Sequence, residues 1–206
     1  MRYDFPNLIP AIVDRIHQRV TMAWYKFRTP ILAWFWGVRC GKGVRFQGKT
    51  IIRTHRVGEI VLGHNVVFNS QVETNLVGLM GPNVLDAFNG GRISIGSSSG
   101  FSSVVLSSRS RIQVGNRVKV GGNVRIFDHD FHSLDPLVRC TSADRDNVRA
   151  KCVVIEDDVF IGTNAIILKG TTLGARSIVA AGSVVFGLQV PPDSLVRGNP
   201  AQVVTR

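Results

Sequence analysis

The chain has 206 residues, 44% hydrophobic and 19% charged, which suits one folded domain with a terminal appendage. Its formal net charge of +11 is uneven: residues 1–58 carry 11 Lys and Arg against two acidic residues, a net of +9, while residues 59–206 carry 14 against 12, a net of +2. No RNA- or DNA-binding module accompanies this basic segment, so nucleic acid is not expected as a partner.

Cysteine usage and the first residues indicate the cellular compartment. The three cysteines, Cys40, Cys140 and Cys152, are odd in number and form no CxxC pair, which argues against a disulfide framework and against a zinc site. Charged residues interrupt positions 1–20, so these lack the continuous apolar core of a signal peptide. We therefore expect a cytoplasmic protein.

Residues 1–37 are predicted to form a helical segment that is both basic and aromatic. Its apolar run from Pro30 to Val38 is too short to span a bilayer. Such a segment suits either a cap on the end of the structure that follows or peripheral contact with the inner face of the cytoplasmic membrane. Both alternatives stay open. Most of its aromatic residues gather from position 24 on, as Trp24, Tyr25, Phe27, Trp34, Phe35 and Trp36.

An aliphatic residue at every sixth position is the main signal in the rest of the chain. A period of six is neither the 3.6 of a helix nor the 2 of a strand, and a β-sandwich would alternate by two, so a solenoid is indicated. Small or branched residues two positions earlier are expected to point inward as well. The aliphatic series is Ile155, Ile161, Ile167, Leu173, Val179 and Val185; the companion series is Val153, Val159, Ala165, Thr171, Ser177 and Ser183.

The predicted fold is an all-β parallel β-helix of hexapeptide repeats over residues 38–190, followed by a C-terminal tail over 191–206. Weaker echoes of the repeat begin at Val38 and Val44. About seven coils at a spacing of ~4.8 Å would build a column of roughly 35 Å. Gly162, Gly174 and Asn164 are expected at corners where φ is positive.

The repeat breaks after Ile126. The aliphatic series resumes at Ile155, 29 residues later. Because 29 is not a multiple of six, a loop insertion is predicted at about 128–152. Long loops on rigid scaffolds often carry function. His129 and His132 stand at the root of this loop, among Asp128, Asp130 and Asp135.

Imidazole titrates near neutral pH, so a histidine here can remove a proton from a hydroxyl and pass it to a leaving thiolate. A solvated polar loop is the plainer alternative. A metal site would need three ligands, and residues 133–206 contain no histidine, so only His64 remains as a third donor. No metal is expected.

Four segments make the chain resemble the hexapeptide-repeat acyltransferases, most closely their bacterial polysaccharide O-acetyltransferase branch. They are Asp130–Ser133, Val153–Gly162, Ala180–Val185 and Arg197–Ala201. The resemblance implies a left-handed β-helix, a homotrimer with active sites between columns, and acetyl-CoA as co-substrate.

The resemblance also assigns roles to residues. It implies His132 as the general base, Asp130 as its orienter or an acceptor ligand, and His129 as a second contact to the acceptor. Gly162, Thr163 and Ala181 would line the pantetheine groove. The family's usual phosphate-binding cation is replaced by Phe186 and Gly187, and its usual Trp by Phe160. Substitute cations are Lys169, Arg176, Arg197 and Arg206.

The implied activity is acetyl transfer to a sugar hydroxyl of a bacterial surface polysaccharide or its precursor, by direct attack on the thioester. The alternatives are an N-acetyltransferase of a nucleotide-linked amino sugar, a metal-dependent β-helix enzyme of the carbonic anhydrase kind, and a non-catalytic scaffold. Residues 1–58 show no Gly-rich signature of a nucleotide-binding βαβ unit, which disfavours the first of these.

Overall fold

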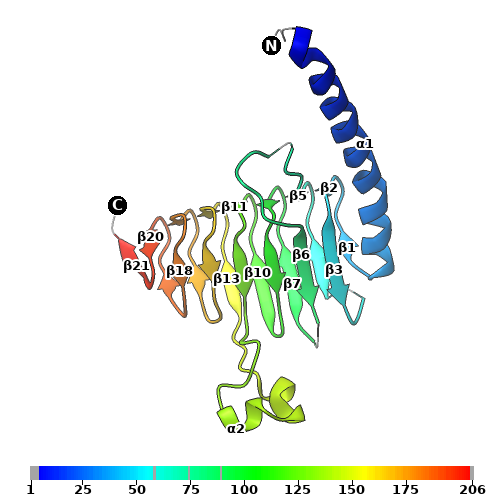
Figure 1. The fold of residues 1–206 in the computed structure, drawn as a ribbon. Helices are drawn as coiled ribbons and strands as arrows, with labels where there is room; N and C mark the ends of the chain where they lie inside the picture. Colours follow the sequence, from blue (N-terminus) through cyan, green and yellow to red (C-terminus); the bar gives the residue numbers. More distant parts are fainter. Residues whose placement is uncertain (1–4, 58, 74, 89, 205–206) are drawn as a thin grey trace.

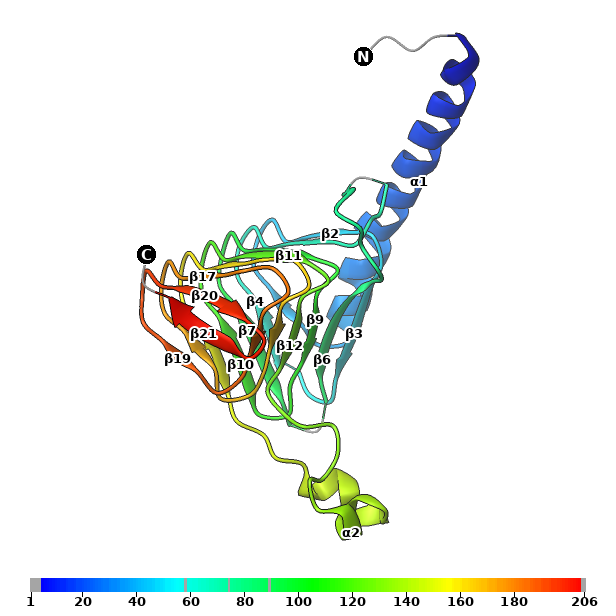
Figure 2. The same cartoon turned by 60° about the vertical axis from the view of Figure 1, so that its left-hand side comes forward.

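The computed structural model describes residues 5–57, 59–73, 75–88 and 90–204. Their strands build a three-sided column (Figures 1 and 2), and almost all pairs are parallel. The fold is the predicted left-handed parallel β-helix. Sheet A comprises β1 (Arg39–Cys40), β4 (Ile60–Leu62), β7 (Arg92–Ile95), β10 (Arg111–Val114), β13 (Val153–Ile155), β16 (Thr172–Leu173) and β19 (Gln189–Val190).

The other two sides of the column are sheets B and C. Sheet B comprises β2 (Arg45–Gln47), β5 (Val67–Asn69), β8 (Gly100–Ser102), β11 (Lys119–Gly122), β14 (Phe160–Ile161), β17 (Ile178–Val179), β20 (Leu195–Gly198) and β21 (Ala201–Val204). Sheet C comprises β3 (Thr50–Thr54), β6 (Asn83–Ala87), β9 (Val105–Ser107), β12 (Arg125–Phe127), β15 (Ile166–Ile167) and β18 (Val184–Val185).

Both predicted inward series fill the interior of the column. Every residue of the two series is at most 1% exposed. Equivalent aliphatics stack from coil to coil, because Ile161 pairs in register with Val120 on one side and with Val179 on the other. In the first coils the same place is taken by a ladder of stacked rings, Phe46, Phe68 and Phe101, with centroids 5.4 and 5.0 Å apart.

The corner prediction was right for Asn164 and wrong for two glycines. Positive φ recurs every sixth residue, at Asp158, Asn164, Gly170, Arg176 and Gly182. Gly162 and Gly174 have no positive φ; each instead lies against the next coil. A Cβ at Gly162 would lie 2.5 Å from the amide nitrogen of Ala181, and one at Gly174 would lie 2.5 Å from that of Pro192.

A matched pair of substitutions separates close approach from backbone conformation. Gly162→Ala forces two coils apart and is expected to lower the free energy of unfolding by about 3 kcal/mol. Gly182 has φ +70°, and no atom of the described residues lies within 4 Å of an added Cβ, so Gly182→Ala is expected to cost about 1 kcal/mol. Denaturant unfolding of both variants measures the difference; equal losses would contradict the close-approach explanation.

The two ends of the column differ. At the N-terminal end of the column stands the helix α1 (Phe5–Phe35). The C-terminal part of α1 packs across β2 and β3, and its N-terminal part projects beyond the column (Figure 1). At the other end, β20 pairs with β17 and β21 folds back on β20 in antiparallel orientation. The column therefore continues past residue 190, where a tail was expected.

In the part of the chain that the structure describes, two long loops leave the column. The larger one departs after β12 and returns at β13, at the break in the repeat, and carries α2 (Pro136–Arg139) and the 3-10 helix η1 (Ser142–Asn147) far out from the sheets (Figure 2). A single antiparallel bridge between His129 and Ala150 closes its root. The other loop, between β5 and β6, was not predicted.

Candidate active site

His132 lies in the protruding loop with one ring nitrogen already engaged. Its Nδ1 is 2.7 Å from Oδ2 of Asp144, a residue of η1. The other oxygen of Asp144 accepts a hydrogen bond of 2.7 Å from the amide of Ser133. These two hydrogen bonds lower the pKa of the Asp144 carboxyl below its usual value, and the bond with His132 has the larger effect. The His132 side chain is 67% exposed, so Nε2 is the ring nitrogen left to meet a ligand.

His129 has a similar carboxylate contact but is buried at the loop root. Its Nδ1 is 3.1 Å from Oδ1 of Asp128, its side chain is 4% exposed, and its ring packs against Phe131. Burial alone would raise the pKa of Asp128. Hydrogen bonds from His129, Ser108 and the amides of Arg109 and Ser110 outweigh burial and lower that pKa.

Asp130 does not contact His132 as its predicted orienter; that position belongs to Asp144. Asp130 instead forms an ion pair with Lys169, which follows β15 one coil further along. The second oxygen of Asp130 is buried and has no hydrogen-bond partner among the described residues. Lys169 also lies 5.2 Å from the centre of the Phe186 ring. Lys169, which was predicted to bind the phosphates of CoA, therefore lies at the root of the loop that carries the two histidines and is engaged in an ion pair with Asp130.

The remaining predicted cofactor residues line one corner of the column, between sheets B and C. Because Ile161 is in register with Val179, and Val179 with Val196, the residues that come directly after these three stack on one another. Gly162, Thr163, Ala181 and Arg197 are thereby brought together along this corner, and Thr163 Oγ1 donates to the carbonyl of Gly122 at 2.7 Å. Arg197 borders an open depression of about 520 Å³ that Asn199 and Gln202 also line.

The histidines and this corner are not adjacent in one chain. The protruding loop with His129 and His132, called the histidine loop below, follows β12 of sheet C, and Lys169 follows β15 of the same sheet. Both therefore lie at the corner between sheets C and A. The structure therefore forms two separate groups from the predicted site residues. Of the other predicted cations, Arg176 is paired with Asp193 at 2.7 Å, and Arg206 lies outside the described residues.

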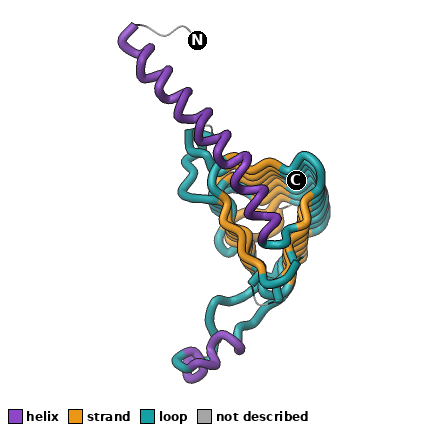
Figure 3. Tube along the Cα trace, turned by 90° about the vertical axis from the view of Figure 1, so that its right-hand side faces the viewer, coloured by secondary structure: helices purple, strands orange, loops and turns teal. Residues whose placement is uncertain are grey.

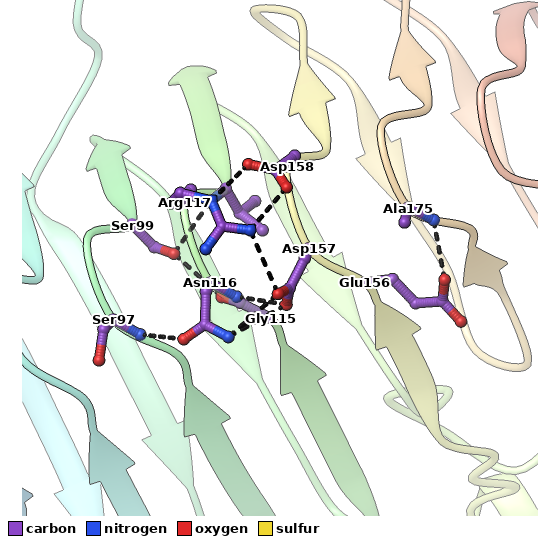
Figure 4. Close-up of polar contacts among 10 residues, drawn as sticks. Ser97, Ser99, Gly115, Asn116, Arg117, Glu156, Asp157, Asp158 and Ala175 are labelled. Atoms are coloured by element: carbon purple, nitrogen blue, oxygen red, sulfur yellow. Dashed lines mark hydrogen bonds and ion pairs between the residues drawn. The ribbon is translucent and has the colours of Figure 1, made fainter.

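The third corner, between sheets A and B, is a polar ladder that links coils (Figure 4). Asn116 donates through its backbone and its side chain to Asp157, and these bonds lower the pKa of that carboxyl. Arg117 binds Asp158 at 2.6 Å. His64 lies at this corner too, accepting from the amide of Lys42, and so is not near the histidine loop. Within the described residues, no group of three or more His, Cys, Asp or Glu is placed to hold a metal.

Sequence reasoning missed Asp144. The pattern from Thr141 to Asp144, a hydroxyl residue followed three positions later by an acid, is a known start of a helical turn. Thr141 does begin η1, and its side chain accepts from the amide of Ala143. This pattern would have placed Asp144 in an ordered turn, although not beside His132.

The comparisons with known proteins agree with the repeat and the fold. A family profile described as "Hexapeptide repeat of succinyl-transferase" matches residues 152–186. A curated 2,3,4,5-tetrahydropyridine-2,6-dicarboxylate N-acetyltransferase from Staphylococcus aureus is 51% identical over 55 residues, which are 27% of this chain and 23% of that protein. The aligned part thus spans about a quarter of the curated relative.

Solved structures match over a much larger part of the chain. A hexapeptide-repeat-containing acetyltransferase from Vibrio cholerae, complexed with acetyl-CoA, is 25% identical over 98% of this chain and 91% of its own, with a TM-score of 0.58. A maltose O-acetyltransferase from Clostridium difficile is 20% identical over 95% and 87%, with a TM-score of 0.56. An N-acyltransferase from Bacillus cereus, in complex with dTDP and 3-hydroxybutyryl-CoA, is 20% identical over 88% and 89%, with a TM-score of 0.64.

The chain is thus a hexapeptide-repeat protein with the left-handed β-helix of the hexapeptide-repeat acyltransferases. The resemblance seen in its sequence motifs is confirmed in the repeat and in the fold.

Proposed function

We propose that the chain is a cytoplasmic O-acetyltransferase that moves the acetyl group of acetyl-CoA to a sugar hydroxyl of a bacterial surface polysaccharide or its precursor. The Vibrio cholerae structure in complex with acetyl-CoA, which matches 98% of the chain, supports acetyl-CoA as the donor. The observation that carries the reaction is the exposed His132, held by a carboxylate through Nδ1.

His132 acts as the general base. Because Asp144 accepts the Nδ1 hydrogen, Nε2 carries the free electron pair and takes the proton of the acceptor hydroxyl. The hydroxyl oxygen attacks the thioester carbonyl, a carbon–oxygen bond forms, the carbon–sulfur bond breaks, and the proton passes to the leaving thiolate. The Asp144 carboxylate stabilises the imidazolium between these steps. Positioning of both reactants supplies much of the rate.

The complete site takes residues from two copies in a homotrimer. The histidine loop and the corner with Gly162, Thr163 and Ala181 lie on different edges of one column, so a neighbouring column is needed to bring them together. Acetyl-CoA would lie along that second corner. We assign the phosphate contact to the exposed Arg197, since Lys169 is already paired with Asp130. Asp130 and His129 remain the candidates for acceptor contacts.

Transfer to nitrogen is the second candidate function. The curated relative from Staphylococcus aureus is an N-acetyltransferase, and one solved neighbour is an N-acyltransferase in complex with dTDP. An amino sugar attached to a nucleotide would be the acceptor in that case. The same base and donor site would serve both reactions.

The test is thiol release from acetyl-CoA in the presence of oligosaccharides and of amino sugars. Release that depends on a hydroxyl acceptor is the expected result, with the product identified as an ester by its loss in mild base. Release with amines alone would replace the O-acetyl assignment by N-acetyl transfer. Loss of turnover with a chelator would favour metal chemistry, and no release with any acceptor would contradict acyl transfer.

The role of Asp144 gives a separate prediction. Asp144→Asn presents an amide donor to Nδ1, favours the wrong tautomer of His132, and is expected to lower kcat about 10²-fold with little change in KM. Asp146→Asn is the matched control, because Asp146 lies in the same 3-10 helix and is exposed. The pH profile of kcat should shift only in the Asp144 variant; unchanged kcat there would remove Asp144 from the site.

A further inference from the structure

The outer face of α1 is strongly apolar. Nine large hydrophobic residues on it are between 46% and 73% exposed. At about 100° per residue, all nine fall within an arc of roughly 120°, which makes one continuous stripe along the helix. The residues of this outer stripe are Ile9, Ile12, Val13, Ile16, Val20, Trp24, Phe27, Ile31 and Trp34.

The helix binds its own column through the opposite face. The helix α1 crosses the first coil (Figure 3) and contacts β2 and β3. Its residues Thr29 and Ala33 are only 0% and 1% exposed. Further along, the side chain of Gln71 donates to the backbone carbonyl of Gln18 at 3.4 Å. By helical spacing, residues 18, 29 and 33 all point away from the outer stripe. The outer stripe is therefore not the face that anchors α1 to the β-helix.

A contiguous apolar surface of this length on a soluble protein marks a contact with another surface. The charges beside it indicate which one. Arg19 and Lys26 border the stripe on one side and Arg28 borders it on the other, all exposed. The only acidic residue among 5–35 is Asp14, which helical spacing places away from the stripe.

These features fit an anionic lipid surface. Basic residues flanking an apolar stripe are typical of helices that lie in the membrane interface, and tryptophans such as Trp24 and Trp34 favour that depth. Another copy of the chain fits less well, because residues 1–58 carry a net charge of +9 and residues 59–206 a further +2, so that contact would bring net positive charges together. Among the described residues, no helix is long and apolar enough to cross a membrane.

We propose that α1 lies flat in the interface of an anionic membrane, with the outer stripe among the acyl chains and Arg19, Lys26 and Arg28 at the headgroups. This goes beyond acetyl transfer and does not depend on it. The β-helix, attached to the opposite face of α1, is then held on the aqueous side.

The test is sedimentation of the full chain with vesicles of phosphatidylcholine alone or of phosphatidylcholine mixed with phosphatidylglycerol. Binding is expected to the mixed vesicles and to weaken as salt is added. The double variant Val20→Glu with Trp24→Glu should lower the partition coefficient about tenfold or more. Arg19→Gln with Lys26→Gln should lower it on mixed vesicles only, by about fivefold per charge at low salt.

Leu137→Glu is the matched control, since Leu137 is 82% exposed and lies in the protruding loop, away from α1 (Figure 1). It should bind vesicles like the unchanged protein. Thermal unfolding of each variant checks that the column is intact. Equal binding by the stripe variant and the control would overturn the proposal. So would a stripe variant that alters only the oligomeric state measured by sedimentation equilibrium, because the stripe would then contact a second copy.

Discussion

Replacing His132 by Ala lowers acetyl-CoA turnover with a hydroxyl acceptor by about 10²-fold or more, because the variant has no group to remove the acceptor proton. The fall should appear in kcat and in kcat/KM alike, since a base acts in the transition state. The side chain is 67% exposed but loses its hydrogen bond with Asp144, so the free energy of unfolding should fall by only about 1 kcal/mol. Thiol release and denaturant unfolding measure the two effects.

His129→Gln is the comparison that makes this result decisive. The His129 ring is buried against Phe131 and contacts Asp128, so its loss should lower stability more than catalysis. A fall in turnover of under about tenfold is expected. An active His132 variant beside an inactive His129 variant would move the general base to His129. Two fully active variants would mean that neither imidazole is the base.

The repeat was predictable because it depends on local spacing. In a β-helix each coil packs on the next one, so a period of six in the sequence becomes a column without any knowledge of distant contacts. Both inward series, from Ile155 to Val185 and from Val153 to Ser183, are buried as expected. The break after Ile126 located the protruding loop for the same reason.

The partners of the site residues were not predictable, because they depend on how an irregular loop folds. Nothing in the spacing of His132 and Asp144, which lie 12 residues apart, shows that their side chains meet. The ion pair of Lys169 with Asp130 spans 39 residues and arises because a later coil passes beside the loop root. The orientation of α1 is a similar case, since its apolar stripe alone would suggest packing against the column rather than away from it.

Asp128→Asn is expected to destabilise the protein by about 3 kcal/mol at neutral pH. Asp128 is 0% exposed and accepts hydrogen bonds from Ser108 Oγ at 2.6 Å and from the amides of Arg109 and Ser110 at 2.8 and 2.9 Å. An asparagine keeps one acceptor oxygen and turns an amide donor toward the other donors, leaving buried groups unpaired. Denaturant unfolding measures the loss, and Asp135→Asn, at an exposed position of the loop, is the control.

The same bonds fix how this loss depends on pH. Since they lower the pKa of Asp128 in the folded protein, the carboxylate stabilises the fold above the unfolded pKa of about 4, and this contribution disappears as pH falls toward the folded value. The original protein and the asparagine variant should therefore differ most near pH 7 and converge below about pH 4. A difference that stays constant from pH 7 to pH 3 would show that packing at the loop root, rather than the buried charge, holds the histidine loop on the column.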